Sequence, residues 1–397
     1  MSHPTAPSPA PPDTLRTQLP ILTGARTISN TVHRMVYPFL PRMARGLGVD
    51  LEAITLAITA RSALGLGGPL FGALADTRGR KAALLTALLI LAAAMLLVTV
   101  WPTYPALFIA LLLAVCAKLI YDPAVLAYIG DRVHYTRRGF AIALNELSWS
   151  AAFLIGMPLL GWLIARTGRW YAPFPVLGGL ALLSAVLVWR VLPGNDTQDI
   201  ERPSLIQGAR IVLRHRPAVA GLLMGTLISL GNETIFIVYG AWMEDSFGLK
   251  VAALGAASVV IGVAELAGEG LVAGLVDRLG KRRAVMLGIG LNALASILLP
   301  VLGFGVGSAL VGLFLFFLTF EFALVSTLPI MTELAPGARA TMMAGTAAAH
   351  SAGRMLGALL GPLLFTGGLL INGLAAALFN LGALALLVSF LPQDERS

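Results

Sequence analysis

The residues best suited to chemistry in this sequence are polar and ionisable side chains that lie inside long apolar stretches. Four of them recur at intervals of four, three and four residues: Arg26, Asn30, His33 and Tyr37. This spacing places them on one face of a helix, with Arg34 slightly off it. If such a stretch crosses a bilayer, a charge at its centre costs about 2.5–3.5 kcal/mol on insertion scales. We therefore expect this face to line a wet cavity or to meet partners.

A second group in the first half of the chain combines both signs of charge. Lys118 and Asp122 are four residues apart, which allows an ion pair along one turn of a helix. A structural pairing is the stronger interpretation for them, and a place in the cavity is the alternative. Glu146 opens a later apolar stretch beside Asn145 and Ser148.

The second half of the chain has acids inside its apolar stretches. The three that stand out are Glu233, Glu265 and Glu321. Burial in a low dielectric raises the pKa of a carboxyl group, so that it can take up a proton near neutral pH. These acids and Glu146 are therefore the candidates for proton coupling, with a static ion pair as the alternative for each. The remaining cavity candidates of this half are Asn232, His350 and Arg354.

Apolar residues dominate the composition. Of the 397 residues, 57% are hydrophobic and 12% are charged, and the mean hydropathy is +0.84. A soluble globular protein carries about 25% charged residues, so this excess cannot be hidden in a core and the surrounding medium must be lipid. The apolar stretches reach the roughly 20 residues that a spanning helix needs, and they lack the short alternating pattern of a membrane barrel.

We expect an all-α integral membrane protein with twelve transmembrane helices in two pseudo-symmetric six-helix halves. The expected spans are 18–44, 52–75, 82–101, 104–128, 139–165, 172–192, 217–243, 251–275, 284–302, 306–330, 340–366 and 371–392. The halves occupy 17–192 and 217–392, and the linker 193–216 contains an amphipathic segment. Residues 1–16 are rich in Pro, Ala and Ser and predict a disordered cytoplasmic tail, and 393–397 form a second tail.

The net charge of +8 and the isoelectric point near 10.1 could indicate nucleic acid binding. The basic residues lie in the loops between apolar stretches, however, and they are more numerous on one side than on the other. By the positive-inside rule this asymmetry places both termini in the cytoplasm. We expect a multi-pass protein of a bacterial plasma membrane, with the lipid bilayer and not a nucleic acid as its partner.

A charged ten-residue loop occurs twice. Residues 72–81 read GALADTRGRK and residues 273–282 read AGLVDRLGKR, at an offset of 201. Other polar pairs recur at nearly the same offset: Asn30 and Tyr37 with Asn232 and Tyr239, and Asp131 and Arg138 with Glu333 and Arg339. A pattern duplicated half a chain away indicates an internally repeated membrane transporter.

The loop resembles the signature of the major facilitator superfamily between its second and third helices, with departures at Thr77 and Ala273. The resemblance covers about the whole chain and implies the major facilitator fold, whose halves rock about a central cavity by alternating access. In that family the loop and the end of the fourth helix latch the two halves together. The residues assigned to this cytoplasmic gate are Gly72, Asp76, Gly79, Arg80, Asp131, Arg138, Asp277, Gly280 and Lys281. Orientation by positive charge is the alternative role.

The fifth expected span carries a second resemblance. Gly156, Pro158 and Gly161 form a reduced version of the antiporter motif of drug:proton antiporters, with departures at Met157 and Trp162. The resemblance implies export. Small residues and a proline also serve ordinary helix packing, which is an equal alternative.

These observations predict a secondary transporter and not an enzyme. No Walker loop or dinucleotide-binding glycine pattern is present, and five His with one Cys argue against a soft metal site, so we expect no cofactor and no metal. The first hypothesis is proton-coupled export of small amphipathic organic compounds, in the manner of the drug:proton antiporter branch. The expected partners are a small-molecule substrate, protons and the bilayer, and the protein is expected to be a monomer.

Two rival hypotheses stay open. One is proton-coupled or facilitative transport of an anionic or lipid-like solute, whose carboxylate or phosphate would be bound by basic side chains. The side chains in question are Arg26, Arg34, Arg61 and Lys118. The other is a transporter fold that acts as a membrane sensor without turnover.

Overall fold

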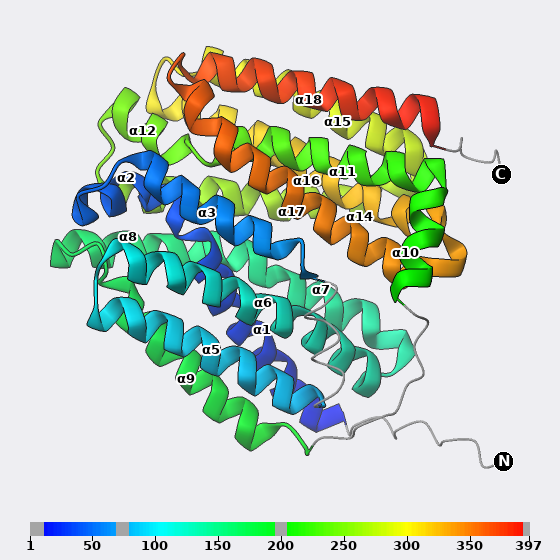
Figure 1. The fold of residues 1–397 in the computed structure, drawn as a ribbon, viewed down its shortest axis with the longest axis horizontal. Helices are drawn as coiled ribbons and strands as arrows, with labels where there is room; N and C mark the ends of the chain where they lie inside the picture. Colours follow the sequence, from blue (N-terminus) through cyan, green and yellow to red (C-terminus); the bar gives the residue numbers. More distant parts are fainter. Residues whose placement is uncertain (1–11, 69–78, 195–204, 392–397) are drawn as a thin grey trace. The chain divides into compact units, whose positions relative to one another are not determined.

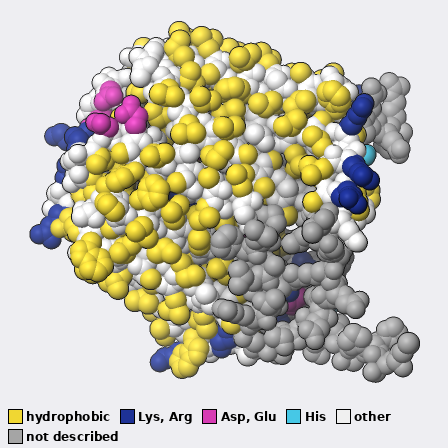
Figure 2. Space-filling view, viewed as in Figure 1, with side chains coloured by type: hydrophobic (Ala, Val, Ile, Leu, Met, Phe, Trp, Pro, Cys, Tyr) yellow, Lys and Arg dark blue, Asp and Glu magenta, His cyan; other side chains and the backbone are white. Residues whose placement is uncertain are grey.

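The computed structural model describes residues 12–68, 79–194 and 205–391. Every regular element in these ranges is a helix, and nine helical segments of the described chain are long and apolar enough to cross a membrane. Apolar side chains cover most of the face seen in Figure 2, and the charged ones lie toward its edges. The expected all-α membrane protein is confirmed, whereas the count of twelve spans stays a prediction.

The helices fall into two compact units, and Figure 1 shows the path of each helix. The first unit contains α1 (Pro12–Arg34), α5 (Arg80–Val100), α6 (Tyr104–Arg132), α7 (Tyr135–Ala151) and α9 (Pro173–Val191). Within it, α5 packs on α6 and α9, and α1 packs on α6, α7 and α9. Leu22, Leu84 and Val188 belong to its apolar core.

The second unit contains three short helices from the first half of the chain: α2 (Val36–Leu47), α3 (Leu51–Gly65) and α8 (Met157–Thr167). The rest are α10 (Leu205–Arg214), α11 (Arg216–Phe236), α12 (Tyr239–Phe247), α13 (Val251–Ala257), α14 (Val259–Leu279), α15 (Lys281–Val301), α16 (Val306–Leu334), α17 (Arg339–Phe365) and α18 (Leu369–Phe390). A π-helix at Ala152–Gly156 precedes α8, and a 3-10 turn at Pro336–Ala338 precedes α17. The amphipathic segment expected in the linker is α10.

A row of glycines brings α17 close to α11. Gly353, Gly357 and Gly361 recur every four residues and face α11. A Cβ added at Gly357 would lie 2.5 Å from the Cβ of Glu233 and 3.0 Å from the carbonyl oxygen of Leu230. Such rows of small residues let two helix backbones approach closely inside a membrane. The row therefore sets α17 directly against Glu233.

Helices from the first half of the sequence pack on helices from the second half inside this unit. α3 packs on α17, α2 packs on α12 and α13, and α8 packs on α13. At the last contact, a Cβ added at Gly161 would lie 3.2 Å from the Cα of Gly255. Gly156 ends the π-helix, and Pro158 lies in the first turn of α8, where a missing N–H is tolerated. These contacts fit the helix-packing interpretation of the fifth-span motif.

Several expected spans have different limits in the structure. The span 18–44 is interrupted at Met35, because Pro38 has no N–H to donate to the carbonyl of Arg34 and its ring disturbs that turn. The span 217–243 is interrupted after Phe236, and 251–275 is interrupted at Ser258.

The chain becomes helical earlier than expected. The tail was expected to reach residue 16, but α1 begins at Pro12. Proline is well suited to the first turn of a helix, where its fixed φ is already helical and its missing N–H leaves no bond unmade.

Candidate functional site

Arg26 is the centre of a buried charge network in the first unit. The residue is 4% exposed. Its Nε donates to Asp122 Oδ1 over 3.1 Å, and its Nη1 donates to Glu146 Oε1 over 2.7 Å. Nη1 also donates to the backbone carbonyl of Asn145 over 3.0 Å. The network joins α1, α6 and α7, so one guanidinium holds residues from three helices.

Lys118 extends this network along α6. Its Nζ lies 2.9 Å from Asp122 Oδ2 and donates to Asn30 Oδ1 over 2.5 Å. Asn30 Nδ2 in turn donates to Ser148 Oγ over 3.0 Å. The predicted Lys118–Asp122 pair is confirmed, and it is part of a larger set because Asp122 also accepts from Arg26. Most groups here have two partners, which fixes their geometry.

Three basic side chains of this unit lie around the ring of Trp149 on α7. The ring centroid lies 4.1 Å from Lys118 Nζ, 4.6 Å from the guanidinium carbon of Arg34 and 6.0 Å from that of Arg26. His33 meets the same ring edge-on at 6.3 Å between centroids. These distances are typical of cation–π interactions. With Asp122 and Glu146 as the acids, the ionised cluster has three positive charges against two negative ones.

Glu233 is the centre of a second buried cluster, in the second unit. Glu233, Tyr37 and Arg61 are each 1% exposed. The hydroxyl of Tyr37 donates to Glu233 Oε1 over 2.9 Å and accepts from Arg61 Nη2 over 3.0 Å. Arg354 also interacts electrostatically with Glu233. One carboxylate thus lies within reach of two guanidinium groups and is linked to one of them through a hydroxyl.

Tyr37, which donates to this carboxylate, belongs to a cluster of aromatic rings around Phe236. The ring of Tyr37 stacks on Phe236 with centroids 3.9 Å apart, and Tyr239 stacks on the same ring at 5.6 Å. Phe153 and Phe317 meet Phe236 edge-on. The hydroxyl of Tyr239 lies 2.9 Å from Ser258 Oγ, so the two repeated tyrosines differ in that Tyr37 contacts an acid and Tyr239 a hydroxyl.

The other candidates of α11 and α17 lie next to this cluster. His350 Nδ1 lies 2.7 Å from Ser229 Oγ, and Arg354 Nε donates to the carbonyl of His350 over 3.4 Å. His350 Nε2 and Asn232 Oδ1 are buried and have no hydrogen-bond partner among the described residues. The structure therefore brings Asn232, Glu233, His350 and Arg354 together on one helix pair.

Glu265 and Glu321 belong to another helix pair. Glu265 is buried on α14 and Glu321 is half-buried on α16. The two helices meet at Gly268, where an added Cβ would lie 2.8 Å from the Cβ of Glu321. The acids proposed for proton coupling are thus distributed over different helix pairs, with Glu146 in the first unit.

The duplicated loop ends in the same geometry in both copies. Gly79 and Gly280 precede α5 and α15 with φ of 83° and 82°, a region that favours glycine. The next residue pairs with an acid at the end of the following long helix: Arg80 Nε lies 3.1 Å from Asp131 Oδ2, and Lys281 Nζ lies 2.5 Å from Glu333 Oε1. Each ion pair lies within one unit.

The second basic residue of each loop caps another helix. Lys81 Nζ donates to the carbonyl of Leu192 after α9 over 2.6 Å, and Arg282 Nη1 donates to that of Leu391 after α18 over 2.5 Å. Cations are favourable at helix C-termini. The repeat that the two loop sequences indicate is therefore also present in the contacts that the loops make.

Four other residues are assigned to the gate, and the structure describes two of them. Arg138 donates to the carbonyl of Val133 over 2.9 Å, and Asp277 is exposed near the end of α14. Gly72 and Asp76 lie outside the described residues.

Sequence reasoning misses Trp149 and the contact of Arg61 with Tyr37. Trp149 follows Asn145 by four residues, so helical spacing could have placed it on the face that meets Arg26. The Arg61–Tyr37 contact joins two helices and leaves no local spacing signal.

Comparisons with known proteins agree with this architecture. The family model described as Major Facilitator Superfamily matches residues 22–358 and 221–397. The MFS-type transporter YceJ of Bacillus subtilis is 27% identical over 305 residues, which are 75% of this chain and 76% of that protein. The chloramphenicol resistance protein of Streptomyces lividans is 28% identical over 351 residues, 86% of each chain. The multi-drug resistance efflux pump PmrA homolog of Lactococcus lactis is 24% identical over 268 residues, 64% of this chain and 65% of that one.

Solved structures share the fold. A bacterial homolog of the human lysosomal transporter Spinster, in an inward-facing conformation, has a TM-score of 0.74 at 14% identity and covers 97% of this chain and 100% of its own. The human organic anion transporter MFSD10 has a TM-score of 0.69 at 17% identity, and the match covers 95% of this chain and 100% of that one.

Proposed function

The chain belongs to the Major Facilitator Superfamily, and on that premise we propose that this multi-pass membrane transporter couples the export of small amphipathic organic compounds to the entry of protons. Glu233 is the proposed proton carrier. Glu265, Glu321 and Glu146 rank behind it, because Glu233 is 1% exposed and accepts a hydrogen bond from Tyr37, a residue of the other half of the sequence.

The contact between Glu233 and Tyr37 is the observation that carries the proposal. Tyr37 opens α2 and Arg61 lies on α3, both from the first half of the sequence, whereas Glu233 and Arg354 lie on α11 and α17 of the second half. When Glu233 is ionised, its charge attracts both guanidinium groups and accepts the bond from Tyr37. A proton on Glu233 removes that attraction.

Loss of the attraction loosens the contact between helices of the two sequence halves. A ligand or proton shifts a conformational equilibrium by its different affinity for the two states. Protonation of Glu233 therefore favours the arrangement in which α2 and α3 separate from α11 and α17, and deprotonation favours the arrangement seen in the structure. Alternation between the two moves a substrate from one side to the other.

Export is supported by two kinds of likeness. Relatives of the chain are described as an efflux pump and as a resistance protein, and Gly156, Pro158 and Gly161 resemble the antiporter motif. The halves proposed for alternating access are 17–192 and 217–392. Both termini are proposed to lie in the cytoplasm, and the protein is proposed to be a monomer. The duplicated loops, including Gly72 and Asp76, are proposed as the cytoplasmic gate.

A second candidate substrate class is an organic anion, and the surroundings of Trp149 favour it. Lys118 and Arg34 lie on this ring at 4.1 and 4.6 Å. A flat anionic compound could stack on the indole ring while its carboxylate or phosphate meets the cations. A lipophilic cation would be repelled at the same place.

The test uses purified protein in liposomes with an acidic lumen and a pH-sensitive dye inside. A neutral amphipathic compound, an organic anion and a lipophilic cation are added outside one at a time. Transported compounds should raise the lumenal pH, and Glu233→Gln should remove that response. A response of equal size in Glu233→Gln would reject Glu233 as the proton carrier, and a response to the anion alone would select the second substrate class.

A further inference from the structure

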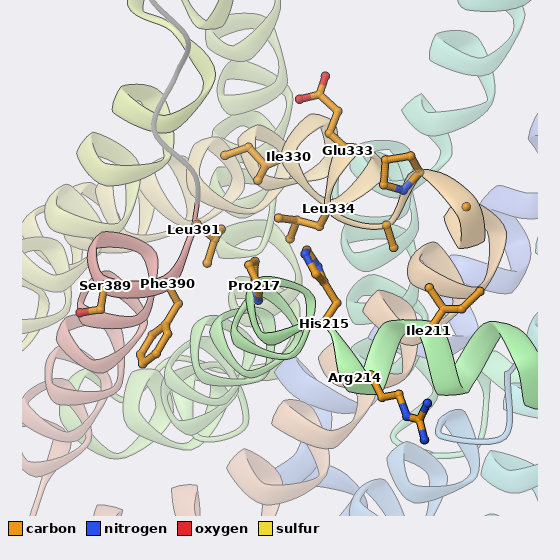
Figure 3. Close-up of a pocket in the computed structure, with 13 residues that line it drawn as sticks. Ile211, Arg214, His215, Pro217, Ile330, Glu333, Leu334, Ser389, Phe390 and Leu391 are labelled. Atoms are coloured by element: carbon orange, nitrogen blue, oxygen red, sulfur yellow. The ribbon is translucent and has the colours of Figure 1, made fainter.

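A pocket of about 700 Å³ lies where α10 meets the ends of α11, α16 and α18 (Figure 3), and its lining residues include none of the Glu233 cluster. Its volume is in the range of small-molecule sites, which are roughly 300–1,000 Å³. The lining residues used in the argument are Ile211, Arg214, His215, Glu333, Phe390 and Leu391.

α10 is anchored to the bundle along one face. Gly208 is buried, and Val212, one turn later, is 3% exposed within the apolar core. Ile211 flanks this face and is 48% exposed. Arg210 lies on the opposite side of the helix, and Arg214, the last residue of α10, lines the pocket. Apolar flanks with outward-facing cations are typical of a helix that lies in the membrane interface.

The pocket lies at the level where several long helices end. α16 ends at Leu334, α18 ends at Phe390 and α11 begins at Arg216. The ends of membrane-spanning helices mark the boundary between hydrocarbon and headgroups. A molecule in this pocket would therefore have its polar part among headgroups, and its apolar part would lie along Ile211 and Phe390.

The charges around the pocket favour an anion. Arg214 and His215 lie on its wall (Figure 3). Glu333, the acid among its lining residues, is paired with Lys281 at 2.5 Å. The carbonyl of Leu391 at the end of α18 is already capped by Arg282. Glu333 and the carbonyl of Leu391 thus each have a cationic partner, and Arg214 and His215 are the basic residues on the wall.

We propose that this pocket binds one anionic phospholipid, with its phosphate against Arg214 and His215 and its acyl chains along Ile211 and Phe390. The positive-inside rule places this basic end of the bundle in the cytoplasm, where anionic lipids are attracted to basic segments by about 1 kcal/mol per Lys or Arg. A bound lipid would fasten α10 to the ends of α11, α16 and α18.

The test measures lipid binding to the detergent-purified full-length protein by native mass spectrometry. Phosphatidylglycerol and phosphatidylcholine with the same acyl chains are titrated against the wild type, Arg214→Ala and Arg210→Ala. The matched control, Arg210, lies one turn earlier on the same helix, is exposed, and does not line the pocket. Thermal unfolding of each variant checks that the fold is retained.

The wild type should bind one phosphatidylglycerol in preference to phosphatidylcholine. Arg214→Ala should weaken that binding about fivefold, in keeping with about 1 kcal/mol per basic residue, while Arg210→Ala stays close to the wild type. Equal binding of the two lipids, or equal losses in the two variants, would overturn the proposal. Displacement of the lipid by millimolar inorganic phosphate would also overturn it, since the site would then recognise a free anion.

Discussion

The network around Arg26 and the cluster around Glu233 are both buried, but their groups are held in different ways. Arg26 contacts two carboxylates, Asp122 and Glu146, so its charge is balanced by direct ion pairs. Glu233 instead accepts from the neutral hydroxyl of Tyr37. Redundant ion pairs resist change, whereas the attraction of Glu233 for Arg354 and Arg61 depends on whether its carboxylate carries a proton. The comparison fits the proposal that the Arg26 network is a scaffold and that the Glu233 cluster is a switch.

The sequence repeat also indicates that the two halves differ in their interior. The loop contacts of Arg80 and Lys281 are equivalent in the two halves. The halves differ at an interior position. The offset of 202 residues that relates Asn30 to Asn232 relates Lys118 of the first half to Phe320 of the second. Duplication has preserved these loop contacts and the pairs Asn30–Asn232 and Tyr37–Tyr239, whereas the position of Lys118 has changed, so the two halves differ at this interior position.

Replacing Glu233 by Gln should have the largest effect. Gradient-driven export should fall by about tenfold or more, because the two conformations no longer differ in proton affinity at this site. Exchange of labelled for unlabelled compound without a gradient should continue, since the Gln oxygen still accepts from Tyr37. Both rates are measured in the same liposomes. Loss of both would mean that the residue is needed for more than coupling.

Replacing Arg26 by Leu should cost the most stability. The change leaves Asp122 and Glu146 without their guanidinium, and breaking a buried pair costs about 3–5 kcal/mol. We expect the lower end, because the Glu146 side chain is 36% exposed. Thermal unfolding of the purified protein measures the loss, with Arg34→Leu on the same helix as the control. An unchanged melting temperature in Arg26→Leu would reject the scaffold role.

Replacing Tyr37 by Phe should have an intermediate effect. The ring still stacks on Phe236, but the hydroxyl between Arg61 and Glu233 is lost, and an unmade buried hydrogen bond costs about 1–3 kcal/mol. Gradient-driven export should therefore fall several-fold and less than in Glu233→Gln. Tyr239→Phe is the matched control, because it is the repeat counterpart of Tyr37 and its hydroxyl contacts Ser258. Equal losses in the two variants would argue against a special role for Tyr37.

Replacing Arg34 by Gln tests whether the substrate is an organic anion or a neutral compound. A cation–π contact is worth about 0.5–2 kcal/mol, so transport of an organic anion should fall several-fold while a neutral compound is moved as before. Initial rates for the two compounds in one preparation provide the comparison. If both rates fall together, the cations around Trp149 serve the fold and do not select the substrate.

Replacing Arg80 or Lys281 by Ala should have the smallest effects, and similar ones. Ion pairs of exposed groups contribute about 0–1 kcal/mol, so each variant should unfold within a few degrees of the wild type. A much larger loss in one variant would show that the two loops have diverged in spite of their common geometry.

Much of the fold follows from composition and local spacing. Hydropathy predicts the helices because lipid requires apolar stretches of a fixed length. The four-residue spacing of Lys118 and Asp122 predicts their pair, since both lie on one helix. The duplicated loops predict equivalent contacts for Arg80 and Lys281, because equal local sequence gives equal local geometry.

Contacts between distant helices do not follow in the same way. Tyr37 and Glu233 are 196 residues apart, and they meet through packing between distant helices, such as that of α2 on α12 and of α17 on α11 and α3. The contacts of Trp149 are hard to predict for a related reason, since the basic residues around its ring come from α1 and α6. The break at Met35 depends on Pro38, a signal that hydropathy averages away.

The most direct test of the central claim counts the protons released when a transported compound binds to the purified protein. A pH indicator in weakly buffered solution near neutral pH reports the release, and calorimetry reports the binding. Because coupling between two ligands is reciprocal, the account predicts about one proton released per compound bound by the wild type. Glu233→Gln should bind the compound and release none. The same release from Glu233→Gln would contradict the account.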